Sequence, residues 1–265
     1  MCLTVAYDGT DFAGSQLQPQ QRTVQGELER AIATLTGHPT RIRASGRTDT
    51  GVHALGQVVA FDSAREIPLK GFFLGINRAL PGDLRVQRTA YCPVGYDPRF
   101  DALEKTYRYL AQVGEAQNPL TRHRAYQLNR LWKLDMGAMR AAAHELTGTH
   151  DYRAFRQADD VRENTMRTLH SIEVSEAYGG DPTMLAIEVR GTAFMKNMVR
   201  ILAGTLIDVG RGRLPLASVP KMLGQDADRV DSGQTAPAHG LTLVRVELGR
   251  KGQPSPFAAA TYPPR

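Results

Sequence analysis

The first hundred residues alternate between the two-residue period of strands and the 3.6-residue period of helices. In order, the pattern predicts a strand at 3–7, a helix from an N-cap at Thr23 through Leu35, a strand at 58–61, a helix at 72–80 and a strand at 84–91. This part of the chain is therefore expected to form an α+β unit.

The rest of the chain repeats this order of elements. In order, the pattern predicts a strand at 106–113, a helix capped by Asp135 and running through Leu146, a loop at 148–155, paired strands at 169–174 and 184–189, a long helix at 194–209, a short helix at 216–223 and a closing strand at 241–248.

Two consecutive α+β halves of similar order suggest a duplicated ferredoxin-like or RRM-like plan with antiparallel sheets. We expect one half at 1–104 and a second at 105–248. The remaining residues, 249–265, are rich in Pro and Gly. This composition favours a flexible or loosely docked tail.

The charge favours a nucleic-acid partner. The net charge is +6, and Arg outnumbers Lys by 27 to 6. The planar guanidinium of Arg suits contacts with phosphates and bases. A genome rich in G and C would give the same bias, so composition alone leaves both explanations open.

Cys2 and Cys92 are the two cysteines of the sequence, and neither belongs to a CxxC motif or a Cys/His cluster. A disulfide framework or a metal site is therefore not expected. No stretch approaches the roughly 20 apolar residues that a membrane span needs, and the first residues do not resemble a leader. We expect a cytoplasmic protein without membrane association.

Arg200 interrupts the most apolar of the predicted helices, at 194–209. Apolar residues surround it on most sides, which indicates a largely buried helix. A buried guanidinium without a counter-ion is costly. Arg200 is therefore expected either to pair with a carboxylate or phosphate, or to reach out to solvent at the helix edge.

A second concentration of polar groups lies in ASGRTDTGVHA, at 44–54. Asp49 stands between two threonines, with two glycines close by, so a base could approach this backbone closely. A carboxylate beside Arg47, or facing Arg200, would stay ionised and could act as a nucleophile or a base. The alternative is an ordinary Asx-type turn, which is common for TDTG.

The segment KTYRYL, at 105–110, places Tyr107 and Tyr109 on one face of a predicted strand. An aromatic ring there could stack on an extruded base, or it could pack in the core. Core packing is the stronger expectation for Tyr109. His53 and His150 could transfer protons, although a single His is more often structural.

Seven segments, taken in order, resemble the tRNA pseudouridine synthase A family. They are YDGTDFAG (7–14), RTVQGELERAI (22–32), GRTDTGVHA (46–54), KTYRYL (105–110), LTGTHDYRAFR (146–156), FMKNMVRILAGTLIDVGRG (194–212) and TAPAHGLTLVRV (235–246). The likeness covers residues 3–248, and its most specific part is the GRTD loop followed downstream by MVR.

The resemblance implies the pseudouridine synthase fold, in which two α+β halves join their sheets around a central basic cleft. It implies a homodimer that isomerises uridines at positions 38–40 of the tRNA anticodon stem-loop without a cofactor. Asp49 matches the catalytic Asp, and Arg200 matches the Arg that ion-pairs with it. Tyr107 matches the Tyr that lies against the target uracil, and Arg47 matches the Arg that takes the place of the flipped nucleotide. Further substrate contacts are expected from Thr48, His53, Arg99 and Phe194.

Three departures from the family pattern bear on substrate choice. Ser15 stands where Trp is usual, YDPR at 96–99 replaces FHAR, and Thr242 replaces a Tyr. Asp97 would add negative charge beside RNA, so we expect it to point away or to pair with Arg99. The alternatives are a divergent paralogue acting on another RNA and a non-catalytic RNA-binding protein on the same fold. A hydrolase ranks last, because the second carboxylate or metal ligands that it would need are missing.

Overall fold

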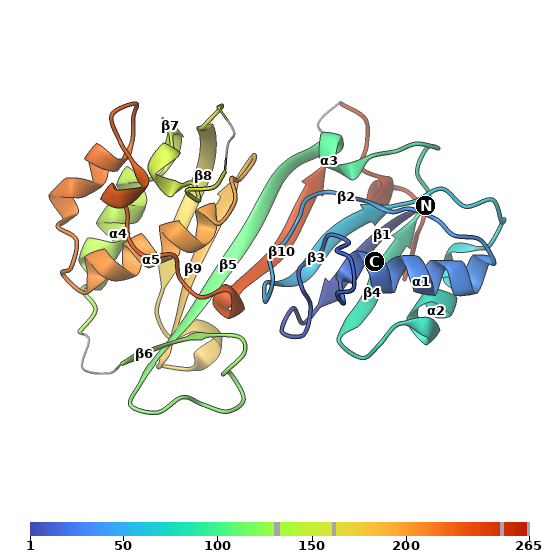
Figure 1. The fold of residues 1–265 in the computed structure, drawn as a ribbon, viewed down its shortest axis with the longest axis horizontal. Helices are drawn as coiled ribbons and strands as arrows, with labels where there is room; N and C mark the ends of the chain where they lie inside the picture. The colour runs from blue at the N-terminus through green and yellow to red at the C-terminus, as the bar shows by residue number, and fades with distance from the viewer. Residues whose placement is uncertain (130–132, 161–162, 250–251, 264–265) are drawn as a thin grey trace. The chain divides into compact units, whose positions relative to one another are not determined.

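The computed structural model describes residues 1–129, 133–160, 163–249 and 252–263. Its helices and strands form two compact units (Figure 1). Unit 1 comprises Met1–Lys105 together with Leu243–Arg265, and unit 2 comprises Thr106–Thr242. The sequence places one boundary after residue 104 and assigns the strand at 241–248 to the second half. In the structure most of that strand belongs to unit 1.

Unit 1 contains an antiparallel sheet. Its strands are β1 (Cys2–Tyr7), β2 (Arg43–Ala44), β3 (His53–Ala60), β4 (Leu84–Ala90), β10 (Leu241–Leu248) and β11 (Thr261–Tyr262). They follow the order β11-β4-β1-β3-β10, and β2 pairs with β3. The apolar β1 has antiparallel neighbours on both sides, with Leu3 opposite Val59 of β3 and Thr89 of β4. The strands predicted at 3–7, 58–61 and 84–91 are confirmed.

Two helices, α1 (Val24–Thr36) and α2 (Leu69–Ala79), pack against each other in unit 1 (Figure 1). Thr23 caps α1 as predicted, because its hydroxyl accepts the N–H of Gly26 and satisfies one of the first N–H groups of the helix. The helix ends at Gly37, where φ is 78°, a conformation that favours glycine. A short helix, α3 (Pro98–Asp101), precedes the long strand β5 (Ala102–Gly114).

The described part of the C-terminal tail docks on unit 1 instead of remaining loose. β11 pairs antiparallel with β4, and the ring of Phe257 is buried in an apolar cluster with Cys2 and Val58. Tyr262 stacks edge-on against Phe73, with ring centroids 5.1 Å apart. The Pro- and Gly-rich composition hides this docking, because a few well-placed aromatic rings are sufficient to anchor a short segment.

Replacing Phe257 with Ala should lower the free energy of unfolding by about 3 kcal/mol, because the substitution empties a buried aromatic site. Phe100→Ala is the matched control, since this side chain in the same unit is 61% exposed; it should change the free energy by no more than about 0.5 kcal/mol. Chemical denaturation measures both. Equal effects of the two substitutions would show that the tail is not docked.

Unit 2 also combines helices with a mainly antiparallel sheet. Its strands, in addition to β5, are β6 (Tyr126–Asn129), β7 (Gly148–Asp151), β8 (Met166–Ser175) and β9 (Met184–Gly191). They follow the order β5-β9-β8-β7, and β6 runs parallel to β5. The sequence predicts a loop at 148–155, but its first four residues form β7. This strand is too short and polar to show an alternating pattern, and its pairing with β8 defines it.

The main helices of unit 2 are α4 (Met136–Glu145) and α5 (Met198–Gly210), which pack together. Asp135 caps α4 as predicted, accepting the N–H of Ala138. Its short 3₁₀ helices are Arg153–Phe155, Tyr178–Gly180, Leu216–Met222, Arg229–Asp231 and Ala238–Gly240, and Pro256–Ala258 is a 3₁₀ helix of unit 1. The short helix predicted at 216–223 is thus a 3₁₀ helix with Pro220 inside it.

The buried helix α5 starts four residues later than predicted. Asn197 precedes it with φ 59°, in the left-handed region, so residues 194–197 lie outside the helix. Every residue of α5 except Arg200 is buried, and all of α5 lies within the described residues. The sequence signal of one guanidinium on an otherwise buried helix is therefore confirmed.

Candidate active site

The Asp49 loop, which we define as residues 45–52, connects β2 to β3. It closes on a tight turn in which the N–H of Val52 donates to the carbonyl of Asp49 over 3.1 Å. Gly51 occupies the third position of this turn with φ 78°, as a type II turn requires. The backbone turn thus accounts for the glycine and fixes the main chain that carries Asp49.

Thr48 is held inside unit 1. It is 7% exposed, and its hydroxyl lies 2.8 Å from the hydroxyl of Tyr7. Its N–H donates to Oγ of Ser15 over 2.8 Å, and its carbonyl accepts the N–H of Ser15 over 3.0 Å. Burial raises the pKa of Tyr7 to about 12. The expected substrate-binding residue Thr48 therefore anchors the loop through both its side chain and its backbone.

His53 lies at the start of β3 and is 6% exposed. Its Nδ1 accepts the N–H of Gly9 over 3.0 Å and is 3.2 Å from a carboxylate oxygen of Asp8. A Cβ at Gly9 would come within 2.1 Å of the Val52 carbonyl, so the turn after β1 packs directly on the Asp49 loop. These contacts give His53 a structural part in addition to the expected substrate contact.

The side chains of Arg47 and Asp49 flank the anchored Thr48. Arg47 is exposed and Asp49 is half-buried. Within unit 1, no residue that the structure describes donates a hydrogen bond to the Asp49 carboxylate or forms an ion pair with it. The loop therefore presents one carboxylate and one guanidinium next to a fixed residue, and the carboxylate has its hydrogen-bonding capacity available.

Lys105 is a contact of this loop that sequence reasoning missed. Its Nζ donates to the carbonyl of Ser45 over 2.8 Å, and a Cβ at Gly46 would lie 2.7 Å from Nζ. Burial, and to a smaller extent the guanidinium of Arg99, lowers the pKa of Lys105 to about 8. Its position at the start of KTYRYL could have drawn attention to it. Its partner Ser45 lies 60 residues away in the sequence, so the contact itself could not be predicted.

Arg99 and Asp97 occupy the short helix α3 and the residue before it. Asp97 caps α3 by accepting the N–H of Arg99 over 2.8 Å. The Arg99 side chain is exposed, and its guanidinium lies 6.0 Å from the centroid of the Phe100 ring. The unusual Asp97 thus pairs with the backbone of Arg99 and not with its side chain.

In unit 2, Arg200 is oriented by two hydrogen bonds. Its Nε donates to the carbonyl of Ala236 over 2.7 Å, and one terminal nitrogen donates to Oδ1 of Asn197 over 2.7 Å. The Ala236 N–H donates in turn to the Arg200 carbonyl over 3.1 Å. Together these bonds fix the direction of the guanidinium. The αL residue Asn197 was not expected to orient Arg200.

Tyr107 and Phe194 meet in unit 2. Their ring centroids are 5.1 Å apart, with the rings at 77° to each other, and Tyr107 is 8% exposed. Tyr109 is completely buried and donates to the carbonyl of Pro237; burial raises its pKa. The stronger expectation of core packing for Tyr109 is confirmed. Two expected site residues, Tyr107 and Phe194, thus lie side by side.

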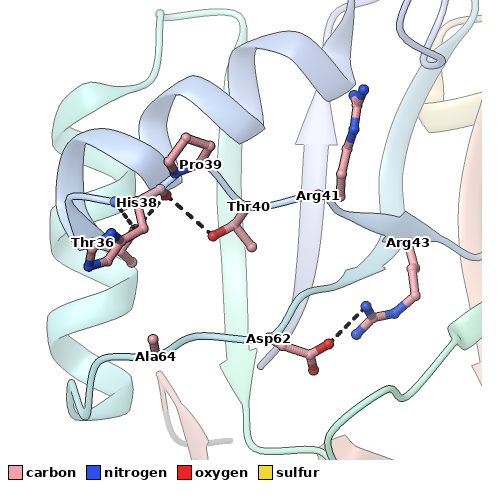
Figure 2. A pocket seen from close by; sticks show the side chains of 8 residues that line it. All are labelled: Thr36, His38, Pro39, Thr40, Arg41, Arg43, Asp62 and Ala64. Atoms are coloured by element: carbon pink, nitrogen blue, oxygen red, sulfur yellow. Dashed lines mark hydrogen bonds and ion pairs between the residues drawn. The ribbon is translucent and has the colours of Figure 1, made fainter.

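A hollow of about 370 Å³ lies in unit 1, apart from the Asp49 loop (Figure 2). Its lining residues are Thr36, His38, Pro39, Thr40, Arg41, Arg43, Asp62 and Ala64. Arg43 pairs with Asp62 over 3.0 Å, as Figure 2 shows, and Arg41 pairs with Glu29. None of the predicted site residues lines this hollow, and its arginines are already neutralised, so it is a weak candidate for a substrate site.

Within the described ranges of the chain, no three His, Cys, Asp or Glu side chains gather in a way that could hold a metal ion. Nor does any helix found there have both the length and the apolar character needed to cross a bilayer.

Residues 3–101 and 142–247 match the family described as tRNA pseudouridine synthase. The chain is 43% identical over 246 residues to tRNA pseudouridine synthase A of Geobacter sulfurreducens, spanning 93% of this chain and 98% of that protein. For the protein of the same name from Geobacter sp. strain M21, the identity is 41% over 244 residues, with coverage of 92% and 96%.

The protein of the same name from Chloroflexus aurantiacus is 43% identical over 93% of this chain and 87% of its own length. A chain in the crystal structure of a Cbf5-Nop10-Gar1 complex is more distant: it aligns with 92% of this chain and 49% of its own length, at 13% identity and a TM-score of 0.40. Our chain belongs to the tRNA pseudouridine synthase family. It is an isomerase that converts uridine in tRNA to pseudouridine.

Proposed function

We propose that this enzyme isomerises uridines at positions 38–40 of the tRNA anticodon stem-loop and that Asp49 is its catalytic carboxylate. The observation that carries the proposal is the state of Asp49. It is half-buried, on a loop whose backbone is held from several sides, and no described residue of its own unit pairs with it. Such a carboxylate has lost part of its hydration, so a cation or a substrate group stabilises it.

Arg200 is the partner that we propose for Asp49. Its neighbours in the first turns of α5 are buried apolar residues. Its guanidinium is oriented by hydrogen bonds to Ala236 and Asn197. A preorganised guanidinium keeps a carboxylate ionised and fixes its direction. Asp49 belongs to unit 1 and Arg200 to unit 2, and the match of both residues to the family's ion pair supports this proposal.

The remaining predicted site residues would handle the RNA. Extruding a base from its stack costs a few kcal/mol, and the exposed Arg47 could offset this cost by occupying the vacated place. Stacking on an aromatic ring contributes about 1–3 kcal/mol per base, which Tyr107, supported edge-on by Phe194, could supply. Arg99 is exposed and available to phosphates.

The reaction breaks the N1–C1′ bond of uridine, turns the uracil, and joins C5 to C1′. The proton on C5 is then lost, and N1 ends as an N–H, so that atoms and charge balance. Asp49 could attack C1′, attack C6 or abstract a proton from the sugar, and it is also a candidate base for the C5 proton. All these roles need Asp49 to be ionised, and the guanidinium of Arg200 would keep it ionised.

We further propose that the enzyme works as a cytoplasmic homodimer and needs no cofactor. Reduced, unpaired Cys2 and Cys92 suit a reducing compartment. A tRNA partner suits the excess of arginine over lysine in the sequence.

Purified enzyme incubated with unmodified bulk tRNA should form pseudouridine at positions 38–40 and nowhere else, as mapped by sequencing. Binding of the same tRNA should weaken roughly 10-fold or more when salt rises from about 50 to about 200 mM, because phosphate contacts release counterions. Pseudouridine at other positions would assign the enzyme to another RNA site. A tRNA affinity that does not change with salt concentration would contradict the proposed phosphate contacts.

A further inference from the structure

Ser15 is buried against the Asp49 loop although it belongs to the segment between β1 and α1. It is 8% exposed. Its hydrogen bonds to the loop involve Thr48: the Ser15 N–H donates to the Thr48 carbonyl over 3.0 Å, and the Thr48 N–H donates to Oγ of Ser15 over 2.8 Å. Oγ is also 3.3 Å from the Thr48 carbonyl.

These bonds occupy the backbone donor and acceptor of Thr48 from a single residue. A serine hydroxyl can accept one hydrogen bond and donate another, so Oγ can accept from the Thr48 N–H while donating toward its carbonyl. A buried backbone N–H without a partner is unfavourable.

The same segment ties the loop to α1. The N–H groups of Val24 and Gln25, in the first turn of α1, donate to the carbonyls of Gly14 and Ser15 over 3.3 and 3.0 Å. A Cβ at Gly14 would lie 3.0 Å from the Thr48 carbonyl, and the φ of Gly14 is 89°. The loop is therefore braced by a segment that the helix itself holds in place.

We propose that Ser15 is a positioning residue for catalysis, which fixes the peptide of Thr48 and thereby the direction of the adjacent Asp49 carboxylate. Ser15 does not contact the reacting atoms. This inference rests on the proposed role of Asp49. It predicts that loss of the Ser15 hydroxyl affects the chemical step and leaves tRNA binding intact, since a small displacement of a catalytic group is sufficient to slow a reaction.

The test compares three substitutions in the full-length enzyme, each measured for kcat and for the Kd of unmodified tRNA. Ser15→Ala should lower kcat by roughly 10- to 100-fold and leave Kd within about 2-fold, and Ser15→Thr, which keeps the hydroxyl, should restore most of the rate. Thr36→Val is the matched control, because it removes a buried hydroxyl at the other end of α1; it should leave kcat unchanged.

Tyr7→Phe provides a second route if Ser15→Ala does not fold. This change removes the hydroxyl that contacts Thr48 and should give the same split between kcat and Kd, with a smaller loss of rate. Wild-type kcat in Ser15→Ala or in Tyr7→Phe, or a parallel loss of kcat and affinity, would overturn the inference. If Asp49→Ala were also fully active, the catalytic proposal itself would fail; an inactive Asp49→Ala beside an active Ser15→Ala would remove only the role of Ser15.

Discussion

Asp49→Ala should abolish pseudouridine formation, with a loss of at least about 1,000-fold in kcat, because it removes the group proposed to take part in covalent or proton-transfer chemistry. Asp49→Asn keeps the shape of the side chain but cannot be ionised, so it should be equally inactive. Single-turnover conversion of tRNA, with the product mapped by sequencing, measures both. Binding of tRNA should persist, since the phosphate contacts do not depend on this carboxylate.

Asp11→Ala is the control for this first prediction. Asp11 is an exposed carboxylate of the same unit, so its removal changes the charge equally and should leave the rate unchanged. An Asp49→Ala enzyme that still converts uridine at a comparable rate would rule out the proposed chemistry. The reaction would then have to be carried out by a group other than Asp49.

Arg200→Met should lower kcat by roughly 100-fold or more, with an effect on tRNA affinity of less than about 3-fold. Methionine keeps much of the apolar stem but cannot keep a carboxylate ionised or direct it. The separation of the two effects is the informative part, because a guanidinium that served only to bind phosphate would lose rate and affinity together. A time course of uridine conversion measures kcat, and filter binding of the same tRNA measures the affinity.

Arg140→Met is the matched control in unit 2. Arg140 forms an ion pair with Glu176 in which the two side chains are 52% and 58% exposed, and such surface pairs contribute little to stability. It removes the same charge from the same unit, so kcat should stay at the wild-type value. An equal loss of rate in both variants would mean that net charge, and not a directed ion pair, explains the effect of Arg200→Met.

The parts of the fold that the sequence predicted are those determined by local patterns. The caps at Thr23 and Asp135 have side chains that bond to the N–H groups three residues ahead. The apolar alternation of β1 and the buried flanks of α5 are equally local. The start of α5 was wrong by four residues, because an Asn at φ 59° leaves no signal in hydrophobic spacing.

The docking of the tail could not be predicted for a different reason. Its anchors are Phe257 and the pairing of β11 with β4, contacts between residues more than 160 positions apart. A segment rich in Pro and Gly looks flexible unless the surface that receives it is known. The composition describes the segment itself and carries no information about the strand β4 with which it pairs.

For the candidate site as well, the sequence pointed to some residues and missed others. The sequence singled out the Asp49 loop for its polar groups among small residues and Arg200 for its place on an apolar helix, and the family resemblance proposed them as site residues. The residues that hold them were missed, since Ser15 reaches Thr48 across 33 positions and Lys105 reaches Ser45 across 60. Serine and lysine in such places look like ordinary polar residues until their partners are seen. The ion pair between Asp49 and Arg200 stays a prediction.

The most direct measurement maps pseudouridine in tRNA from cells that lack this gene and are supplied with either the wild-type or the Asp49→Ala copy. The account predicts that pseudouridine at positions 38–40 is absent without the gene, returns with the wild-type copy and does not return with Asp49→Ala. Restoration of those pseudouridines by the Asp49→Ala copy, or an unchanged map in cells without the gene, would contradict it.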